Sequence, residues 1–398
     1  MFKIISTTLC LATSLVSLEA KNLQSDLEAG QFKQIIDGHS QPKTNQDRFE
    51  KSLSQLALSL EKVQQGLYRH GFEISSTTAG IRSLAPLQHN PSPEVADYKS
   101  IRKLLEDFHL DLHKIETILA SVGDDDFHLP LNLIKVRFDV NMDGEYSPNE
   151  SSIAIVFNME NNGALNLSQL EELAETDATI GFDRSDLLWL KGYTQVLLGT
   201  TDLILAHDFQ ASFDAVSHHV FQKTNNQLVN AGATSKNYGD VADLLAAIHL
   251  TKMKVIEPER LKQARQHLLG MVSCSKQMWV SILAETDDRK EWLPSPKQNS
   301  VTGIKMTDSM VKEWHVFLAE YESILNGTKL VPHWRFEGKG INLKRVLEES
   351  KETDVILWIT GHAAVPYLEE GALTEDDLWR QLDRTFNNNF LGMSFFIN

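Results

Sequence analysis

The sequence predicts a mainly α-helical protein with minor β structure. Several long segments carry apolar residues at the three- and four-residue spacing of an amphipathic helix, and some end in a glycine that suits a helix C-terminus. One short run, DVILWITG over 354–361, is rich in β-branched and aromatic residues and predicts a strand. Because no internal repeat is found, we expect a multi-helix globular protein and not a solenoid.

The helical signals divide the chain into two regions, 46–255 and 256–398, which can pack together as one domain. The 285–300 segment, rich in charged residues and proline, interrupts the helical pattern of the second region. Helices are expected over 47–71, 97–123, 184–222 (as one helix or two), 239–256, 258–284, 307–327 and 373–386, the last with Thr374 as its N-cap.

Several of these helices carry recognisable end signals. Gly71 and Gly327 suit helix C-termini, because glycine readily adopts the left-handed conformation found there. Asp183 and Asp186 suit a helix N-terminus, where free N–H groups need acceptors. Pro258 suits a first helical position, since its missing N–H is not needed there.

The composition is that of a soluble globular protein with an acidic surface. Hydrophobic residues make up 42% of the 398 residues and charged residues 23%, which argues against a disordered chain. The formal net charge is −16, from 54 acidic and 38 basic side chains. This balance argues against nucleic acid as the main partner and suits the binding of cations.

The first 20 residues have the pattern of a secretory signal peptide. Lys3 supplies a positive start, an apolar run of about 15 residues follows over 4–18, and Ala20 suits the position before a cleavage point. We therefore expect an exported protein, periplasmic or secreted, with a flexible lead-in over 21–45. No later stretch is long and apolar enough to span a bilayer, so no transmembrane segment is expected after signal removal.

The two cysteines, Cys10 and Cys274, agree with this placement. Removal of residues 1–20 leaves Cys274 alone, so the mature protein is expected to have no internal disulfide and to depend on its core for stability. Export without a disulfide favours a bacterial periplasm over a eukaryotic extracellular space.

The segment DVNMDGEYSPNE, residues 139–150, places an oxygen-bearing side chain at nearly every second position. Calcium takes six to eight oxygen ligands, and a twelve-residue loop supplies them when a glycine at its sixth position, here Gly144, permits a sharp turn. A bidentate carboxylate closes such a loop at its twelfth position. The expected Ca²⁺ ligands are Asp139, Asn141, Asp143, the carbonyl of Glu145, and Glu150, with a water-mediated contact from Ser147.

This segment resembles the EF-hand calcium-binding loop, over these twelve residues only; no family is recognised for the rest of the chain. Tyr146 and Ser151 stand where that loop has aliphatic and apolar residues, and the preceding 129–138 is expected to be extended instead of helical. The nearby 158–169 lacks the charges of a partner loop. The resemblance implies a solitary EF-hand-like loop on irregular flanks that binds calcium in a mainly structural role, because millimolar calcium outside the cytoplasm fills even a weak site.

A second candidate site is a helix face that carries His207, Asp214 and His218. The seven- and four-residue spacings place the three side chains within about 40° of one another on an ideal helix. Two imidazoles and a carboxylate can hold a transition metal. The same pattern fits a core-facing helix with a solvated end, and we prefer that interpretation.

Two loops, 285–298 and 358–367, are further candidates for chemistry, through charged residues beside Trp292 and through His362. Each also fits an ordinary structural loop, and the chain has no recognised nucleophile, zinc-protease or phosphate-binding motif. The favoured hypothesis is therefore a non-enzymatic, exported calcium-binding protein whose protein partner is undefined. The alternative is a periplasmic enzyme, hydrolase-like or dependent on a transition metal, that uses the helix face and these two loops.

Overall fold

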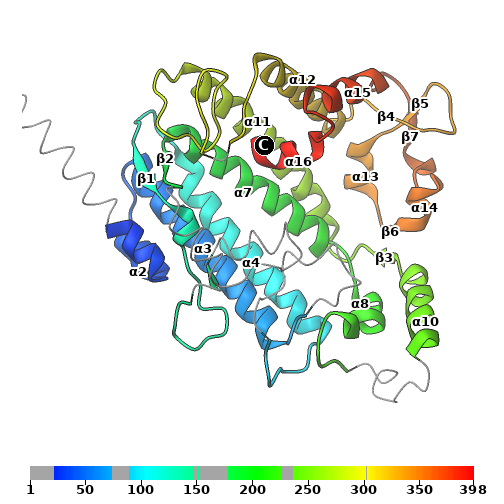
Figure 1. The fold of residues 1–398 in the computed structure, drawn as a ribbon. Helices are drawn as coiled ribbons and strands as arrows, with labels where there is room; N and C mark the ends of the chain where they lie inside the picture. Colours follow the sequence, from blue (N-terminus) through cyan, green and yellow to red (C-terminus); the bar gives the residue numbers. More distant parts are fainter. Residues whose placement is uncertain (1–21, 74–88, 148–149, 152–177, 226–235, 302) are drawn as a thin grey trace, which may run out of the picture.

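The computed structural model of the chain is mainly helical (Figure 1). It describes residues 22–73, 89–147, 150–151, 178–225, 236–301 and 303–398. The predicted signal peptide over 1–20 and the segment 158–169 lie outside these residues. Within the described residues, no helix combines the length and the apolar content needed to cross a bilayer.

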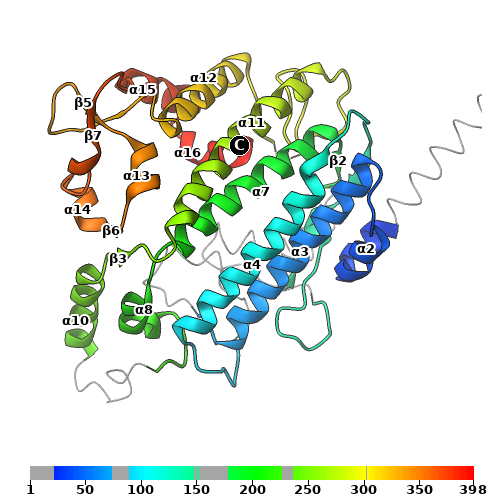
Figure 2. The same cartoon turned by 180° about the vertical axis from the view of Figure 1, so that it is seen from behind.

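Four long helices lie side by side and form the body of the protein, as both views show (Figures 1 and 2). They succeed one another across this layer in chain order, and each packs against the next. The most extensive interface among the described elements joins the third helix to the fourth. The four are α3 (Asn45–Arg69), α4 (Tyr98–Ile118), α7 (Arg184–Leu205) and α11 (Pro258–Ala284).

Shorter helices surround this layer, and the C-terminal ones pack against one face of α11 (Figure 1). Their bounds are α2 (Phe32–Gly38), α8 (Gln210–Val216), α10 (Lys236–His249), α12 (Asp308–Leu325), α13 (Leu343–Glu349), α14 (Val355–Ile359), α15 (Asp376–Thr385) and α16 (Phe390–Ile397). Short 3₁₀ helices cover Leu119–Ser121, Leu133–Lys135, Ser217–His219 and Val365–Tyr367.

The β structure of the described residues consists of short antiparallel pairings at the edges of the helical layer. Leu129 pairs with Phe182 in the first sheet, and Lys252 pairs with Asp354 in the second. The third sheet has the strand order β4-β5-β7. The strands are β1 (Leu129–Leu131), β2 (Ile180–Phe182), β3 (Lys252–Lys254), β4 (Val331–Pro332), β5 (Lys339–Ile341), β6 (Glu352–Asp354) and β7 (Leu368–Glu370).

Two large hydrophobic clusters make up the core. The first lies between α3, α4 and α7 and includes Leu112 and Leu198. The second joins Trp279 of α11 to Trp314 of α12, and it reaches α7 through Leu188. Because α7 contributes to both clusters, the predicted regions 46–255 and 256–398 share a core, and the pairing of α7 with α11 joins them.

The helix-end signals are confirmed where the structure describes them. Gly71 and Gly327 follow α3 and α12 with φ of 64° and 71°, the left-handed region that glycine tolerates. Asp183 caps α7 and forms a reciprocal capping box with Asp186, and Pro258 begins α11. The predicted extended segment 129–138 is likewise not a helix of the EF-hand type: it holds β1 and one turn of 3₁₀ helix.

The strand predicted over 354–361 is wrong. The strand of this region, β6, ends at Asp354, and the apolar residues that follow form the short helix α14. The Asp354 carboxylate accepts a hydrogen bond from the N–H of Leu357, so an N-cap overrides the β propensity of the run. The helix predicted over 239–256 also differs from the structure, where it ends at His249, before β3.

The lead-in predicted as flexible over 21–45 is also corrected, because much of it packs onto the body. The side chains of Leu27 and Phe32 are fully buried, and α2 packs beside α3. The ring of Phe32 lies 5.7 Å from that of Phe138, just before the candidate calcium loop. Finally, α15 begins later than predicted, with Glu375 instead of Thr374 as its N-cap.

Two adjacent residues of α11, one buried and one exposed, allow a test of which side of the helix faces the core. Ile282 is 2% exposed in the second cluster, whereas Leu283 is 50% exposed. We expect Ile282→Ala to lower the free energy of unfolding by about 2–5 kcal/mol, because it leaves a cavity in a packed core. Leu283→Ala should change it by less than about 0.5 kcal/mol. Urea unfolding followed by circular dichroism measures both, and equal losses would contradict the assignment.

Candidate metal sites

The turn of the loop at 139–150 is stabilised by its own side chains, which accept hydrogen bonds from backbone N–H groups two to five residues later. The N–H of Gly144 donates to Asp139 Oδ2 at 3.2 Å, that of Asp143 to Asn141 Oδ1 at 3.0 Å, and that of Glu145 to Asp143 Oδ1 at 2.8 Å. Gly144 has φ of 81°, a conformation that side chains disfavour. These contacts curl the backbone into a compact turn.

Glu150 closes this loop onto its own beginning. Its Oε1 accepts from the N–H groups of Val140 and Asn141 at 3.0 and 3.3 Å. Its Oε2 accepts from the N–H and the hydroxyl of Ser147 at 3.1 and 2.8 Å. Because Glu150 is only 2% exposed, its carboxylate lies inside the loop and not in solvent.

Negative charge is concentrated where the loop meets α3. Oδ1 of Asp139 is buried and has no hydrogen-bond partner. The N–H of Asp139 donates to Oε2 of Glu61, on α3, at 2.9 Å. Burial, together with the charges of Asp139 and Glu150, raises the pKa of Glu61 to about 7. The negative charges of both loop acids therefore act on Glu61, and one of these acids, Asp139, has an unsatisfied oxygen atom.

The outer acids of the loop point away from this centre in the described conformation. Asp143 and Glu145 are exposed, and Asp143 Oδ2 accepts a hydrogen bond from Asn141 Nδ2 at 2.7 Å. Among the described residues, no three acids of this loop have carboxylate oxygens that all lie within 4.8 Å of one another. Calcium binding would therefore draw the side chain of Asp143 inward.

The second predicted site, on a helix through His207, Asp214 and His218, is not assembled. Of the two alternatives for 184–222, one helix or two, the structure has two, because α7 ends at Leu205 and α8 begins at Gln210. The ideal-helix geometry that placed the three on one face therefore does not apply. His207 is held instead by Leu203 O, at 2.8 Å from its Nδ1.

The other two members of that predicted site have partners of their own. Asp214 is exposed and accepts from the side chain of Gln210 at 2.8 Å. His218 and His219 both lie beside Asp243, with Nε2 to Oδ2 distances of 3.0 and 3.3 Å. This surface triad has metal-type spacing, but it does not include His207 or Asp214.

The aromatic side chains Trp189 and Tyr193 of α7 lie where the C-terminal helix α16 packs onto α7. The indole rings of Trp189 and Trp292 contact each other, and Trp189 stacks on Tyr193 with 5.0 Å between ring centroids. Nε1 of Trp189 donates to the carbonyl of Phe396, in α16, at 2.8 Å. These side chains therefore form part of a packed interface.

The two candidate loops, 285–298 and 358–367, lie on different sides of the molecule (Figure 1). The first packs beside β2, where the N–H of Gly181 donates to Lys290 O at 3.1 Å. The second adjoins β4, where His333 Nε2 lies 3.0 Å from Gly361 O. The enzyme alternative combined these loops with the helix face, and the structure does not bring these three parts together.

Glu285 and Glu291 of the loop 285–298 lie close to Asp183 at the N-terminus of α7. Their carboxylate oxygens are within 4.8 Å of one another, a spacing that could hold a metal ion. Each carboxylate has a structural role there. Asp183 accepts from the N–H of Ser185 at 2.7 Å, Glu285 accepts from the Ser185 hydroxyl, and Glu291 accepts from the N–H of Arg289 at 2.8 Å. Burial raises the pKa of Glu285 and of Glu291 to about 7.

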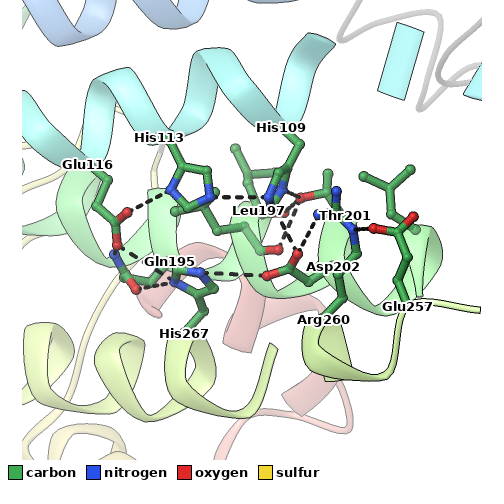
Figure 3. A network of polar contacts seen from close by, with 12 residues as sticks. His109, His113, Glu116, Gln195, Leu197, Thr201, Asp202, Glu257, Arg260 and His267 are labelled. Atoms are coloured by element: carbon green, nitrogen blue, oxygen red, sulfur yellow. Dashed lines mark hydrogen bonds and ion pairs between the residues drawn. The ribbon is translucent and has the colours of Figure 1, made fainter. Parts of the chain in front are cut away.

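A buried polar network joins α4, α7 and α11, and the sequence did not predict it (Figure 3). Nε2 of His109 lies 3.1 Å from Nε2 of His113, and both residues belong to α4. The Asp202 carboxylate of α7 faces them: its Oδ1 is 3.4 Å from His109 Nε2. His267 of α11 completes the ring, with Nε2 3.6 Å from Asp202 Oδ2.

Burial controls the charge state of this network. Asp202 is completely buried, and its Oδ2 has no hydrogen-bond partner. Arg260 donates to its Oδ1 at 2.9 Å and partly offsets the cost of burial, which nevertheless raises the pKa of Asp202. Burial lowers the pKa of His109 to about 4 and also lowers that of His267. These two imidazoles are therefore neutral at pH 7.

One signal for the network was present in the sequence. His109, His113 and Glu116 are separated by four and three residues, so an amphipathic helix over 97–123 places them on one face. Nothing in the local sequence pairs them with Asp202 or His267, which come from other helices.

Comparisons of the chain with protein-family models, with curated proteins and with solved structures find no match.

The acids at the N-terminus of α7 predict a pH dependence of stability. Because the folded pKa of Glu285 and Glu291 is raised from 4.5 to about 7, the folded state binds more protons than the unfolded state. Stability from this source is therefore complete below about pH 4.5 and is lost as the pH rises through about 7. The double variant Glu285→Gln/Glu291→Gln should lose less stability than wild type between about pH 5 and pH 8.

Urea unfolding midpoints of both proteins at the two pH values measure this difference. Glu259→Gln is the matched control, because the Glu259 side chain is 75% exposed and its removal should leave the pH dependence unchanged. The account is wrong if the double variant and wild type lose stability in parallel.

Proposed function

We propose that this protein is an exported calcium-binding protein in which the loop at 139–150 binds one Ca²⁺ ion in a structural role. The observation that carries the proposal is the unsatisfied, buried Oδ1 of Asp139 inside a loop whose last acid, Glu150, folds back onto its first residues. A hard cation supplies the positive charge that this group of oxygen atoms lacks.

The ligands would come from successive positions of the loop. Side-chain oxygens of Asp139, Asn141 and Asp143 would bind first, followed by the carbonyl of Glu145 and both carboxylate oxygens of Glu150. Ser147 would contact the ion through a water molecule. The exposed side chain of Glu145 would remain in solvent, which agrees with a role for its carbonyl alone.

A structural role fits the position of the loop, which contacts two separate segments. Gln65 of α3 donates from Nε2 to the carbonyl of Asp139 at 2.8 Å. The ring of Tyr146 covers Gly30 so closely that a Cβ on that glycine would lie 1.9 Å from a ring carbon. Tyr146, which departs from the EF-hand pattern, thus contacts the N-terminal segment, in a position where the family pairs with a second loop. Calcium would fix this junction between the N-terminal segment and α3.

Calcium titration of the full-length chain tests the proposal. We expect one site with a dissociation constant on the order of 10⁻⁴ M, the range of extracellular modules, and a higher melting temperature in calcium than in chelator. Asp139→Ala and Glu150→Gln should each weaken binding by at least about tenfold, because each removes a direct ligand. Isothermal titration calorimetry and a thermal melt provide the two measurements.

Glu145→Gln is the matched control, since it removes a charge from the same loop but keeps the carbonyl ligand. The calcium affinity of this variant should stay within about threefold of wild type, because solvent and salt screen an exposed charge and its loss weakens binding only slightly. Absence of heat and of any change in melting temperature for wild type would refute calcium binding. An equal loss in Glu145→Gln and Glu150→Gln would show only general attraction of cations to an acidic surface.

A further inference from the structure

We propose that the chain has a second metal site, of a different kind, in the helical body. Nε2 of His109, His113 and His267 and the carboxylate of Asp202 would bind one divalent transition-metal ion of the zinc class. This site is independent of the calcium loop and would hold α4, α7 and α11 together (Figure 3). The hydrogen-bond partners of the three imidazoles carry the inference, because they determine which ring nitrogen has the proton.

The tautomer of His109 follows from its contact with Thr201. The Thr201 hydroxyl has a single proton, which it donates to a backbone carbonyl of its own helix, Leu197 O at 2.9 Å or Leu198 O at 3.0 Å. It must therefore accept the hydrogen bond from His109 Nδ1, at 2.7 Å. With the proton on Nδ1, the neutral ring carries its lone pair on Nε2.

The same reasoning applies to the other two rings. The Gln195 amide donates from Nε2 to the carboxylate of Glu116 at 2.9 Å, so its oxygen faces His267 and accepts from Nδ1 at 2.8 Å. His113 Nδ1 lies 2.9 Å from the other oxygen of Glu116, an acceptor, and donates to it. Each imidazole thus has its Nδ1 proton bound to an oxygen atom, the arrangement that fixes metal-binding histidines in place.

With all three imidazoles neutral, their Nε2 electron pairs face one another or the Asp202 carboxylate without a proton between them. His109 Nε2 and His113 Nε2 are 3.1 Å apart, and the unpartnered Oδ2 of Asp202 faces the lone pair of His267 at 3.6 Å. Two acceptors at such distances repel each other unless a cation lies between them. In a tetrahedral zinc site with bonds of about 2.0–2.1 Å, neighbouring ligand atoms are roughly 3.3 Å apart.

The four ligand residues surround a space wider than a closed coordination sphere. They are not among the described groups in which three ligand atoms lie within 4.8 Å of one another, so a bound ion would draw the side chains inward. Three imidazoles and one carboxylate suit zinc and related ions, whereas calcium requires oxygen ligands. Arg260 contacts only Oδ1 of Asp202 and leaves Oδ2 available.

An ion can reach this ring from one side. The side chains of His113 and Glu116 are 43% and 35% exposed, whereas those of His109 and Asp202 are 5% and 0% exposed. A pocket of about 440 Å³ is lined in part by Glu116 and Gln195, the hydrogen-bond partners of His113 and His267, although none of the four ligands lines it directly. The ring therefore has a buried floor and a solvent-facing edge.

Zinc titration of the chelator-treated, full-length chain without a histidine tag tests the proposal. We expect one tight Zn²⁺ per chain in competition with a chromogenic chelator, and visible Co²⁺ absorption bands of a tetrahedral site. His113→Ala should weaken zinc binding by at least about tenfold and should fold, because the residue is half-exposed. Asp202→Asn keeps the shape of the side chain, and we expect a similar loss.

Two controls make the outcome specific. The double variant His218→Ala/His219→Ala removes the surface triad, and Glu150→Gln disables the calcium loop; both should bind zinc as wild type does. Absence of stoichiometric zinc binding and of Co²⁺ bands in wild type would overturn the proposal, whatever the variants do. Loss of binding in His218→Ala/His219→Ala, with retention in His113→Ala, would also overturn it by assigning the ion to the surface.

Discussion

The carboxylate of Asp202 has no solvent contact, and polar side chains from α4 and α11 converge on it. Burial of a charged group is costly unless other groups pair with it. Arg260 pairs with Oδ1, whereas Oδ2 has no hydrogen-bond partner. Because α4, α7 and α11 each contribute a member of this network, the three helices must meet at this carboxylate.

That requirement explains why the body is arranged around α7. The helix contributes Asp202 to the polar network and apolar residues to both hydrophobic clusters. Arg260 is held in turn by Glu257, whose carboxylate also binds Arg102 of α4, so ion pairs connect the helices beyond the ring of histidines. The two candidate metal sites therefore have different relations to the fold: one lies within the body, and the other fastens an N-terminal segment to its outside.

Local sequence was sufficient for most helices, and insufficient where distant residues decide the structure. Glycine and aspartate signals located the ends of α3, α7 and α12, because capping depends on neighbouring residues. Of the alternatives of one helix or two over 184–222, the structure has two, but the sequence did not locate the break after Leu205, and β propensity wrongly predicted a strand after Asp354. The spacing of His109 and His113 was visible, but its meaning depends on residues far along the chain.

Two separate metal sites, one selective for calcium and one for a zinc-like ion, form the central claim. Equilibrium dialysis of the full-length chain against both ions tests it directly, with bound calcium and zinc measured by elemental analysis as the excess over the surrounding buffer. Wild type should retain one calcium and one zinc, Glu150→Gln zinc alone, and Asp202→Asn calcium alone. A single substitution that removes both ions, or a wild-type chain that retains neither, would contradict the account.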